Sequence, residues 1–279
     1  MLPFAVRYYE IAARRSPLCV GIDPAPETLA AWDLPFSAEG ARSFGLKLVE
    51  VTGERVGVFK PQIAFFERFG PAGFQALSDV MQAIADAGAL CLSDVKRLDI
   101  DHTLVAYAGA WIGQDAGFPS DAITVGAYTG ARALRPVVTR AAEHGAGIFV
   151  LTRSSNPEGL ELQNARIADG RTIAEQIADE ITAFNREVAD EATGPVGAVI
   201  GATLDDAMPV LDRLPQSLIL APGIGAQGAT ISDVARRFGP HARRTLPAVS
   251  RQVAKAGPGG NALIDVVTKL TDEAARLLD

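Results

Sequence analysis

The 279-residue chain contains only two cysteines and three histidines. Cys19 and Cys91 both fall in predicted buried strands, where a small apolar side chain is common, so we expect neither a disulfide nor a cysteine nucleophile. The histidines, His102, His144 and His241, are scattered along the chain without the spacing of metal ligands. The sequence therefore argues against a metal site.

Long apolar runs and an excess of positive charge are also missing. No run approaches the ~20 apolar residues that a membrane-spanning helix needs, and residues 1–7 lack the order of regions found in a signal peptide. We therefore expect no membrane partner and a cytoplasmic location. The formal net charge of −7 argues against a nucleic-acid partner.

Short apolar runs alternate with helical patterns along the whole chain. The predicted strands are 18–22, 56–59, 89–92, 122–125, 147–151, 196–200, 217–220 and 244–246. The predicted helices are 41–54, 72–87, 103–112, 131–144, 172–187, 204–211, 231–238 and 262–278. Strands that are short and apolar on both faces are typical of a parallel sheet covered by helices. Eight such units predict a single (β/α)8 barrel (TIM barrel) domain over residues 1–279, with a doubly wound open sheet as the alternative.

Charged residues follow the third predicted strand, where Asp94, Lys96 and Asp99 lie within six residues. In an extended segment Asp94 and Lys96 would point to the same face, because side chains alternate along a strand. The second predicted strand ends in a similar way, on Lys60. Taken alone, this spacing is more often a surface salt-bridge network. Together, two lysines and two aspartates would form a neutral cluster that can place a negative charge beside a substrate anion.

The position of the other polar residues favours an enzyme. Asp23, Ser155 and Gln227, like Lys60 and Asp94, each follow the end of a predicted strand. In a (β/α)8 barrel the chemistry is carried by the loops at the carboxyl ends of the strands. The polar residues would therefore meet at one end of the barrel.

Two loops are candidates for holding a phosphate. A glycine-rich stretch with Pro222, Gly225 and Gln227 follows the seventh predicted strand, and Ser250 and Arg251 follow the eighth. Barrels often bind phosphate between these two loops, where backbone N–H groups can approach the anion. Arg251 would add a charge-assisted contact. The alternatives are a structural turn and a solvated arginine at a helix start.

These residues together resemble orotidine 5′-phosphate decarboxylase in its longer bacterial form, over nearly the whole chain. The D-x-K-x-x-D-I-x-x-T pattern combined with a G-x-G-A-Q-G loop at this spacing is specific. The matching motifs are LCVGIDP at 18–24, FKPQ at 59–62, FFE at 65–67, DVKR at 94–97 with Asp99, Ile100 and Thr103, SNPEG at 155–159, PGIGAQG at 222–228, and Ser250-Arg251.

The resemblance implies conversion of orotidine 5′-monophosphate to uridine 5′-monophosphate and carbon dioxide in pyrimidine biosynthesis, without a cofactor. It implies a catalytic tetrad in which Asp94 lies beside the substrate carboxylate and Lys96 delivers the proton. It also implies a homodimer in which Asp99 enters the partner's site. The implied site residues are Lys60, Asp94, Lys96 and Asp99 for catalysis, Ile100 and Thr103 across the interface, Asp23 on the ribose, Ser155 on the pyrimidine, Gln227 and Arg251 on the phosphate, and Pro222, Gly225 and Ser250 elsewhere around the substrate.

The chain departs from the family pattern at five positions. The family usually has glycine where Leu98 and Asp101 stand, serine where His102 stands, and Asn or Ser followed by Pro where Gly126 and Ala127 stand. None of these is a tetrad position. Three of them flank the residues that would cross to the partner, so a change in activity, substrate specificity or dimer geometry stays open.

Two other functions are compatible with the sequence. The first is a different enzyme on the same barrel, a metal-dependent sugar-phosphate decarboxylase or an aldolase, which the D-x-K-x-x-D spacing alone permits. The loops around Ser155 and Gln227 argue against it. The second is a catalytically silent nucleotide-binding paralogue, against which the intact tetrad argues.

Overall fold

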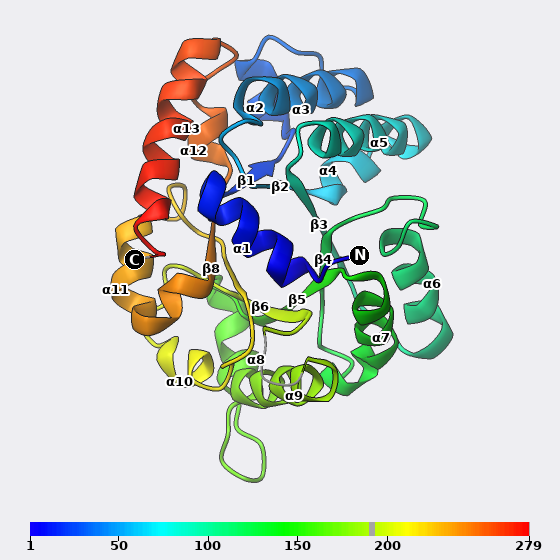
Figure 1. Cartoon of the computed structure of the whole chain (residues 1–279), viewed down its shortest axis with the longest axis vertical. Helices are drawn as coiled ribbons and strands as arrows, with labels where there is room; N and C mark the ends of the chain where they lie inside the picture. Colours follow the sequence, from blue (N-terminus) through cyan, green and yellow to red (C-terminus); the bar gives the residue numbers. More distant parts are fainter. Residues whose placement is uncertain (190–192, 279) are drawn as a thin grey trace.

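The computed structural model describes residues 1–189 and 193–278, in which eight parallel strands form a closed barrel in sequence order (Figure 1). The barrel closes where Cys19 and Val20 of the first strand pair with Ala248 and Val249 of the last. This pairing confirms the predicted (β/α)8 barrel and excludes the open sheet. The strands are β1 Cys19–Ile22, β2 Val58–Pro61, β3 Leu90–Arg97, β4 Ala122–Val125, β5 Gly147–Arg153, β6 Val196–Ile200, β7 Ile219–Ala221 and β8 Thr245–Val249.

Helices surround the barrel, and each predicted helix overlaps an observed one (Figure 1). The longer helices are α3 Ala38–Thr52, α5 Gly70–Asp86, α6 Asp101–Trp111, α7 Arg135–His144, α9 Ile173–Val188, α11 Ile231–Phe238 and α13 Gly260–Ala275. Shorter helical segments are α2 Pro26–Ala31, α4 Ile63–Glu67, α8 Leu160–Asn164, α10 Met208–Leu211, α12 Arg251–Ala254 and three 3₁₀ turns, η1 Ala131–Leu134, η2 Pro157–Gly159 and η3 Gly239–Arg244.

Proline accounts for two differences from the predicted helix boundaries. The helix expected over 204–211 begins only at Met208, with Pro209 in its first turn. The helix expected over 131–144 is divided into a 3₁₀ turn and α7, which has Pro136 in its first turn. Proline lacks a backbone N–H and clashes with the preceding turn, so it fits only at the start of a helix.

Helix α1, Phe4–Arg14, lies across the middle of the barrel in Figure 1 and was not predicted. Its Phe4 ring meets Phe149 of β5 edge-on, with ring centroids 5.9 Å apart. The hydroxyl of Tyr8 donates to the backbone oxygen of Thr245, at the start of β8, at 3.2 Å. The same apolar cluster contains residues from the first positions of several strands, among them Cys19, Val58 and Leu90. Helix α1 therefore closes the amino-terminal end of the barrel and leaves the carboxyl end open.

The structure also bears on membrane association. Within the described part of the chain, no helix is long and apolar enough to cross a bilayer.

Candidate active site

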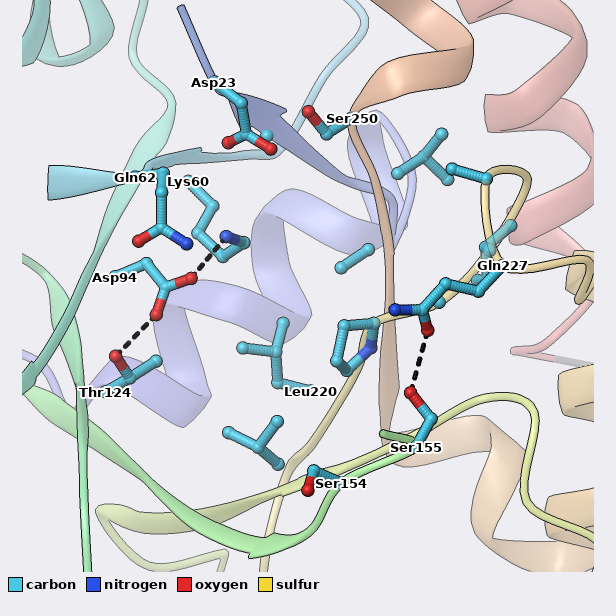
Figure 2. A pocket seen from close by; sticks show the side chains of 18 of the residues that line it. Asp23, Lys60, Gln62, Asp94, Thr124, Ser154, Ser155, Leu220, Gln227 and Ser250 are labelled. Carbon is cyan, nitrogen blue, oxygen red and sulfur yellow. Dashed lines mark hydrogen bonds and ion pairs between the residues drawn. The ribbon is translucent and has the colours of Figure 1, made fainter. Parts of the chain in front are cut away.

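A cavity of about 350 Å³ occupies the carboxyl end of the barrel. Nine of the thirteen residues expected in the site line it, and they come from the ends of β1, β2, β3, β5, β7 and β8. They are Asp23, Lys60, Asp94, Lys96, Ser155, Pro222, Gln227, Ser250 and Arg251. Polar side chains that are far apart in the sequence thus meet in one cavity (Figure 2).

Asp94 lies at the centre of the charged groups. Its Oδ2 accepts from Lys60 Nζ at 2.7 Å, and its Oδ1 accepts from Lys96 Nζ at 2.5 Å. Lys60 and Asp94 are only 8% and 7% exposed. Burial alone would raise the pKa of Asp94, but the charges and hydrogen bonds of the two lysines hold that pKa well below its usual range. Burial alone would lower the pKa of Lys60, yet Asp94 and, to a lesser extent, Asp23 raise it above its ordinary value. Both groups are therefore ionised at neutral pH.

Lys96 reaches this cluster from a backbone irregularity. Its φ is +46°, in the left-handed region that side chains other than glycine rarely adopt. On either side of it Ser93 pairs with Ile123 and Arg97 with Val125, so three residues of β3 lie opposite one residue of β4. Asp94 and Lys96 do meet as predicted, but this β-bulge breaks the regular strand alternation from which we predicted the contact. The Lys96 side chain is 43% exposed, so its ammonium group is accessible to a molecule in the cavity.

Asp23 offers an acceptor to such a molecule. Its Oδ1 is buried and has no hydrogen-bond partner among the described residues. Leaving a buried polar atom without a partner costs about 1–3 kcal/mol. Gly21 keeps this side of the cavity compact, because a Cβ on it would lie 2.7 Å from Ser250 Cβ. The arrangement suits a ligand that donates from a hydroxyl group.

The glycine-rich loop after β7 needs its glycines for backbone conformation. Gly223, Gly225 and Gly228 have φ values of +108°, +76° and +92°. The loop carries Gln227 over the cavity, where its Oε1 accepts from Ser155 Oγ at 2.8 Å (Figure 2). Gly225 itself lines a neighbouring groove, which it shares with Arg251.

Arg251 is a cation that lines the cavity beside this loop. It lies at the start of α12, is exposed, and has no ion-pair partner within the described residues. A free guanidinium group at the edge of a cavity can form a bidentate contact with a phosphate or a carboxylate. The glycine-rich loop and Arg251 together can therefore hold an anion.

Besides Gly225, three of the expected site residues, Asp99, Ile100 and Thr103, do not line the cavity of their own chain. Asp99 Oδ1 accepts from the neighbouring Ile100 N–H at 2.9 Å. Ile100 is 51% exposed, and Thr103 is also exposed. Leu98, Ile100, Val105 and Tyr128 form the exposed apolar residues of this region, which we call the β3–α6 patch.

Several residues that line the cavity are not among the predicted site residues, and two of them, Thr124 and Gln62, lie next to Asp94. Thr124 of β4 donates from Oγ1 to Asp94 Oδ1 at 2.7 Å (Figure 2). The backbone of Gln62, just beyond β2, forms an isolated parallel β-bridge with that of Asp94. Gln62 could have been predicted, because it is a polar residue after a predicted strand, the feature that pointed to Asp23, Ser155 and Gln227. Thr124 is the only polar residue of β4, but threonine is common in strands, so its presence there does not predict a site.

Two of the departures from the family pattern complement each other in volume. A Cβ on Gly126 would lie 2.8 Å from Leu98 Cδ2 and 3.2 Å from Leu98 Cβ, so the large side chain occupies the space left by the small one. A third departure, Asp101, has φ +47°, which explains why glycine is usual there. Aspartate tolerates this conformation better than most residues.

The cysteines and the possible metal ligands add no further site. Cys19 and Cys91 are buried and unpaired, and burial raises the pKa of Cys19 to about 12. Within residues 1–189 and 193–278, no group of three or more His, Cys, Asp or Glu side chains is arranged to hold a metal ion.

A closed eight-stranded barrel with a buried lysine–aspartate–lysine cluster, a glycine-rich loop and an accessible arginine around one cavity has the architecture of a (β/α)8-barrel enzyme. The chain belongs to the orotidine 5′-phosphate decarboxylase / HUMPS family, whose sequence profile matches residues 16–265. This finding confirms the resemblance inferred from the motifs.

Individual relatives agree with the family assignment. Orotidine 5′-phosphate decarboxylase of Myxococcus xanthus is 45% identical over 262 residues, which cover 94% of this chain and 91% of the relative. A crystal structure from Streptomyces avermitilis assigned to the same enzyme superposes with a TM-score of 0.94 at 43% identity and covers 100% of this chain and 96% of that one. The OMP decarboxylase of Leishmania donovani gives a TM-score of 0.79 at 30% identity, covering 98% of this chain and 99% of that one.

The packing of Leu98 over Gly126 predicts energetic coupling between the two positions. Gly126→Ala should lower the free energy of unfolding by about 1–3 kcal/mol, because the added methyl group overpacks the contact. In a Leu98→Gly background most of that loss should disappear, which gives a coupling of about 0.5–3 kcal/mol in a double-mutant cycle of denaturant unfolding. Gly109→Ala is the control, since a Cβ there meets nothing within 4 Å. Additive effects of the two substitutions would contradict the contact.

Proposed function

We propose that this chain decarboxylates orotidine 5′-monophosphate to uridine 5′-monophosphate in pyrimidine biosynthesis, without a cofactor. The observation that carries the proposal is Asp94, buried and ionised between Lys60 and Lys96 at the bottom of the cavity. The family and its named relatives support the substrate. A barrel sugar-phosphate decarboxylase or aldolase, or a silent nucleotide-binding paralogue, would leave orotidine 5′-monophosphate unchanged.

The charges of the cluster suit the chemistry of this reaction. Asp94 would lie beside the substrate carboxylate, where the two negative charges would repel each other. When the bond between C6 and the carboxylate breaks, carbon dioxide leaves and the electron pair stays on C6. The Lys96 ammonium would stabilise this carbanion and then donate its proton to C6. Lys60, through its contact with Asp94, and Asp99 would hold Lys96 in position.

The rest of the cavity would bind the nucleotide. The orphaned Asp23 Oδ1 would accept from a ribose hydroxyl, and Ser155 would contact the pyrimidine. Gln227 and Arg251 would hold the phosphate, while Pro222 and Ser250 would shape the surrounding wall. Gly225, which lines the neighbouring groove, would act on the substrate through the conformation of the loop. Gln227, on the phosphate side of the site, already accepts from Ser155, on the pyrimidine side. Closure of the glycine-rich loop would therefore connect phosphate binding to the position of the base.

We further propose a homodimer in which Asp99, Ile100 and Thr103 enter the partner's site. Their absence from their own cavity and the exposure of the β3–α6 patch support this arrangement. A two-fold interface would bury the same patch on both subunits. The single-domain organisation and the cytoplasmic location stay predictions.

Lys96→Ala tests the proton donor. The substitution should lower turnover of orotidine 5′-monophosphate by at least about 10²–10⁴-fold, because it removes the general acid, while the fold is retained. Lys96→Arg should not restore turnover, since a guanidinium group does not readily give up its proton. Lys47→Ala, in an exposed ion pair on α3, is the matched control and should behave as the wild type. Turnover is followed spectrophotometrically. Near-normal turnover by the folded Lys96→Ala variant would show that Lys96 is not the proton donor.

Mixing two inactive variants tests the shared site. Lys96→Ala and Asp99→Ala subunits should complement each other, because a heterodimer holds one site with both defects and one with neither. Random exchange at equal concentrations makes about half of the dimers mixed, so roughly a quarter of the wild-type sites should return. Mass spectrometry of the mixture would verify the exchange. No recovery despite exchange would mean that Asp99 acts within its own chain.

Arg251→Ala tests phosphate capture. A charge-assisted contact of ~2–3 kcal/mol corresponds to a loss of roughly 30- to 150-fold in kcat/KM. The loss should appear mainly in KM, and Gln227→Ala should lose less because it removes a neutral group. Both losses should largely vanish with orotidine, which lacks the phosphate. An equal penalty of Arg251→Ala on orotidine would place the phosphate elsewhere.

A further inference from the structure

Thr124 contacts two of the charged residues at once. It lies in β4, is 1% exposed, and lines the cavity. Its Oγ1 donates to Asp94 Oδ1 at 2.7 Å and accepts from the Lys96 backbone N–H at 3.0 Å (Figure 2 shows the first contact). One hydroxyl group therefore bridges the carboxylate at the centre of the cluster and the backbone of the lysine that we propose as proton donor.

The β-bulge explains why a hydroxyl group is needed at this point. Three residues of β3 lie opposite Thr124 alone, so the regular ladder of backbone hydrogen bonds is interrupted there. The Lys96 N–H, in a left-handed backbone conformation, finds its acceptor in the Thr124 side chain instead. This hydrogen bond is partly buried, and an N–H group that is shielded from water and has no acceptor costs free energy. Thr124 thus stabilises the backbone geometry that turns Lys96 toward Asp94.

The same contacts orient the carboxylate. Because Thr124 Oγ1 accepts from the Lys96 N–H, its only proton is free to point at Asp94 Oδ1. Oδ1 then has two donors, Thr124 and the Lys96 ammonium, while Oδ2 has Lys60. Threonine is branched at Cβ and has few side-chain rotamers, so the hydroxyl group is held in place.

We propose that Thr124 is a positioning residue that sets the geometry between Asp94 and Lys96. The inference rests on the proposed function. A positioning residue of this kind acts on the step at C6 rather than on substrate binding, so its loss should lower kcat and leave KM nearly unchanged.

Thr124→Val removes the hydroxyl group and keeps the shape. We expect kcat to fall by about 10- to 100-fold, the range for losing a hydrogen bond to a charged group, with KM changed by less than about threefold. Thr124→Ser retains the hydroxyl group and should recover most of kcat. Thr124→Cys has a weaker donor and acceptor, so its kcat should lie between the values for the valine and serine variants. The cysteine variant tests the inference if Thr124→Val does not fold.

Thr152→Val is the matched control. Thr152 is also buried, at 2% exposure, and its Oγ1 donates to a backbone oxygen away from the charged cluster at 2.9 Å. Loss of the Thr152 hydroxyl group should lower the melting temperature. It should leave kcat unchanged when the assay temperature is well below the melting temperature. The inference is overturned if Thr124→Val keeps kcat within about threefold, if its loss lies in KM, or if Thr152→Val loses as much kcat. An inactive wild-type protein would instead overturn the proposed function, and this inference with it.

Discussion

The structure of the cavity depends on keeping Asp94 ionised although the residue is almost fully buried. A buried carboxylate without partners would take up a proton. Here two lysines and a threonine hydroxyl group surround both of its oxygens, so the charge is retained. The buried pair of Lys60 and Asp94 contributes little to stability by itself, since desolvation offsets much of the attraction. Its value lies in holding a negative charge at a defined place beside Lys96.

The barrel supplies the conditions for that charge. Helix α1 covers the amino-terminal end with Phe4 and Tyr8, and the cavity lies at the carboxyl ends of the strands. Parallel strands bring Lys60 and Asp94 side by side, and the bulge in β3 turns Lys96 back onto Asp94. The glycine-rich loop and Arg251 lie around the same opening. The charged cluster and the anion-binding loop therefore line the same small cavity.

The sequence predicts the barrel well, because short strands buried on both faces leave a strong apolar signal. It also predicts which polar residues gather at the carboxyl end, since each follows a strand. Helix α1 was missed although Phe4, Tyr8 and Ile11 have helical spacing, because a helix before the first strand is not part of the repeating unit. The bulge at Lys96 was missed because a left-handed residue other than glycine has no sequence signature. Thr124 was missed for the same reason, since its role exists only opposite that bulge.

The most direct test is an assay of the wild-type protein with orotidine 5′-monophosphate in the presence of a metal chelator. The loss of substrate absorbance and the release of carbon dioxide are followed together. A charge cluster that acts without a metal predicts complete conversion to uridine 5′-monophosphate with equal release of carbon dioxide. An unchanged substrate, or conversion that needs an added divalent metal, would contradict the account.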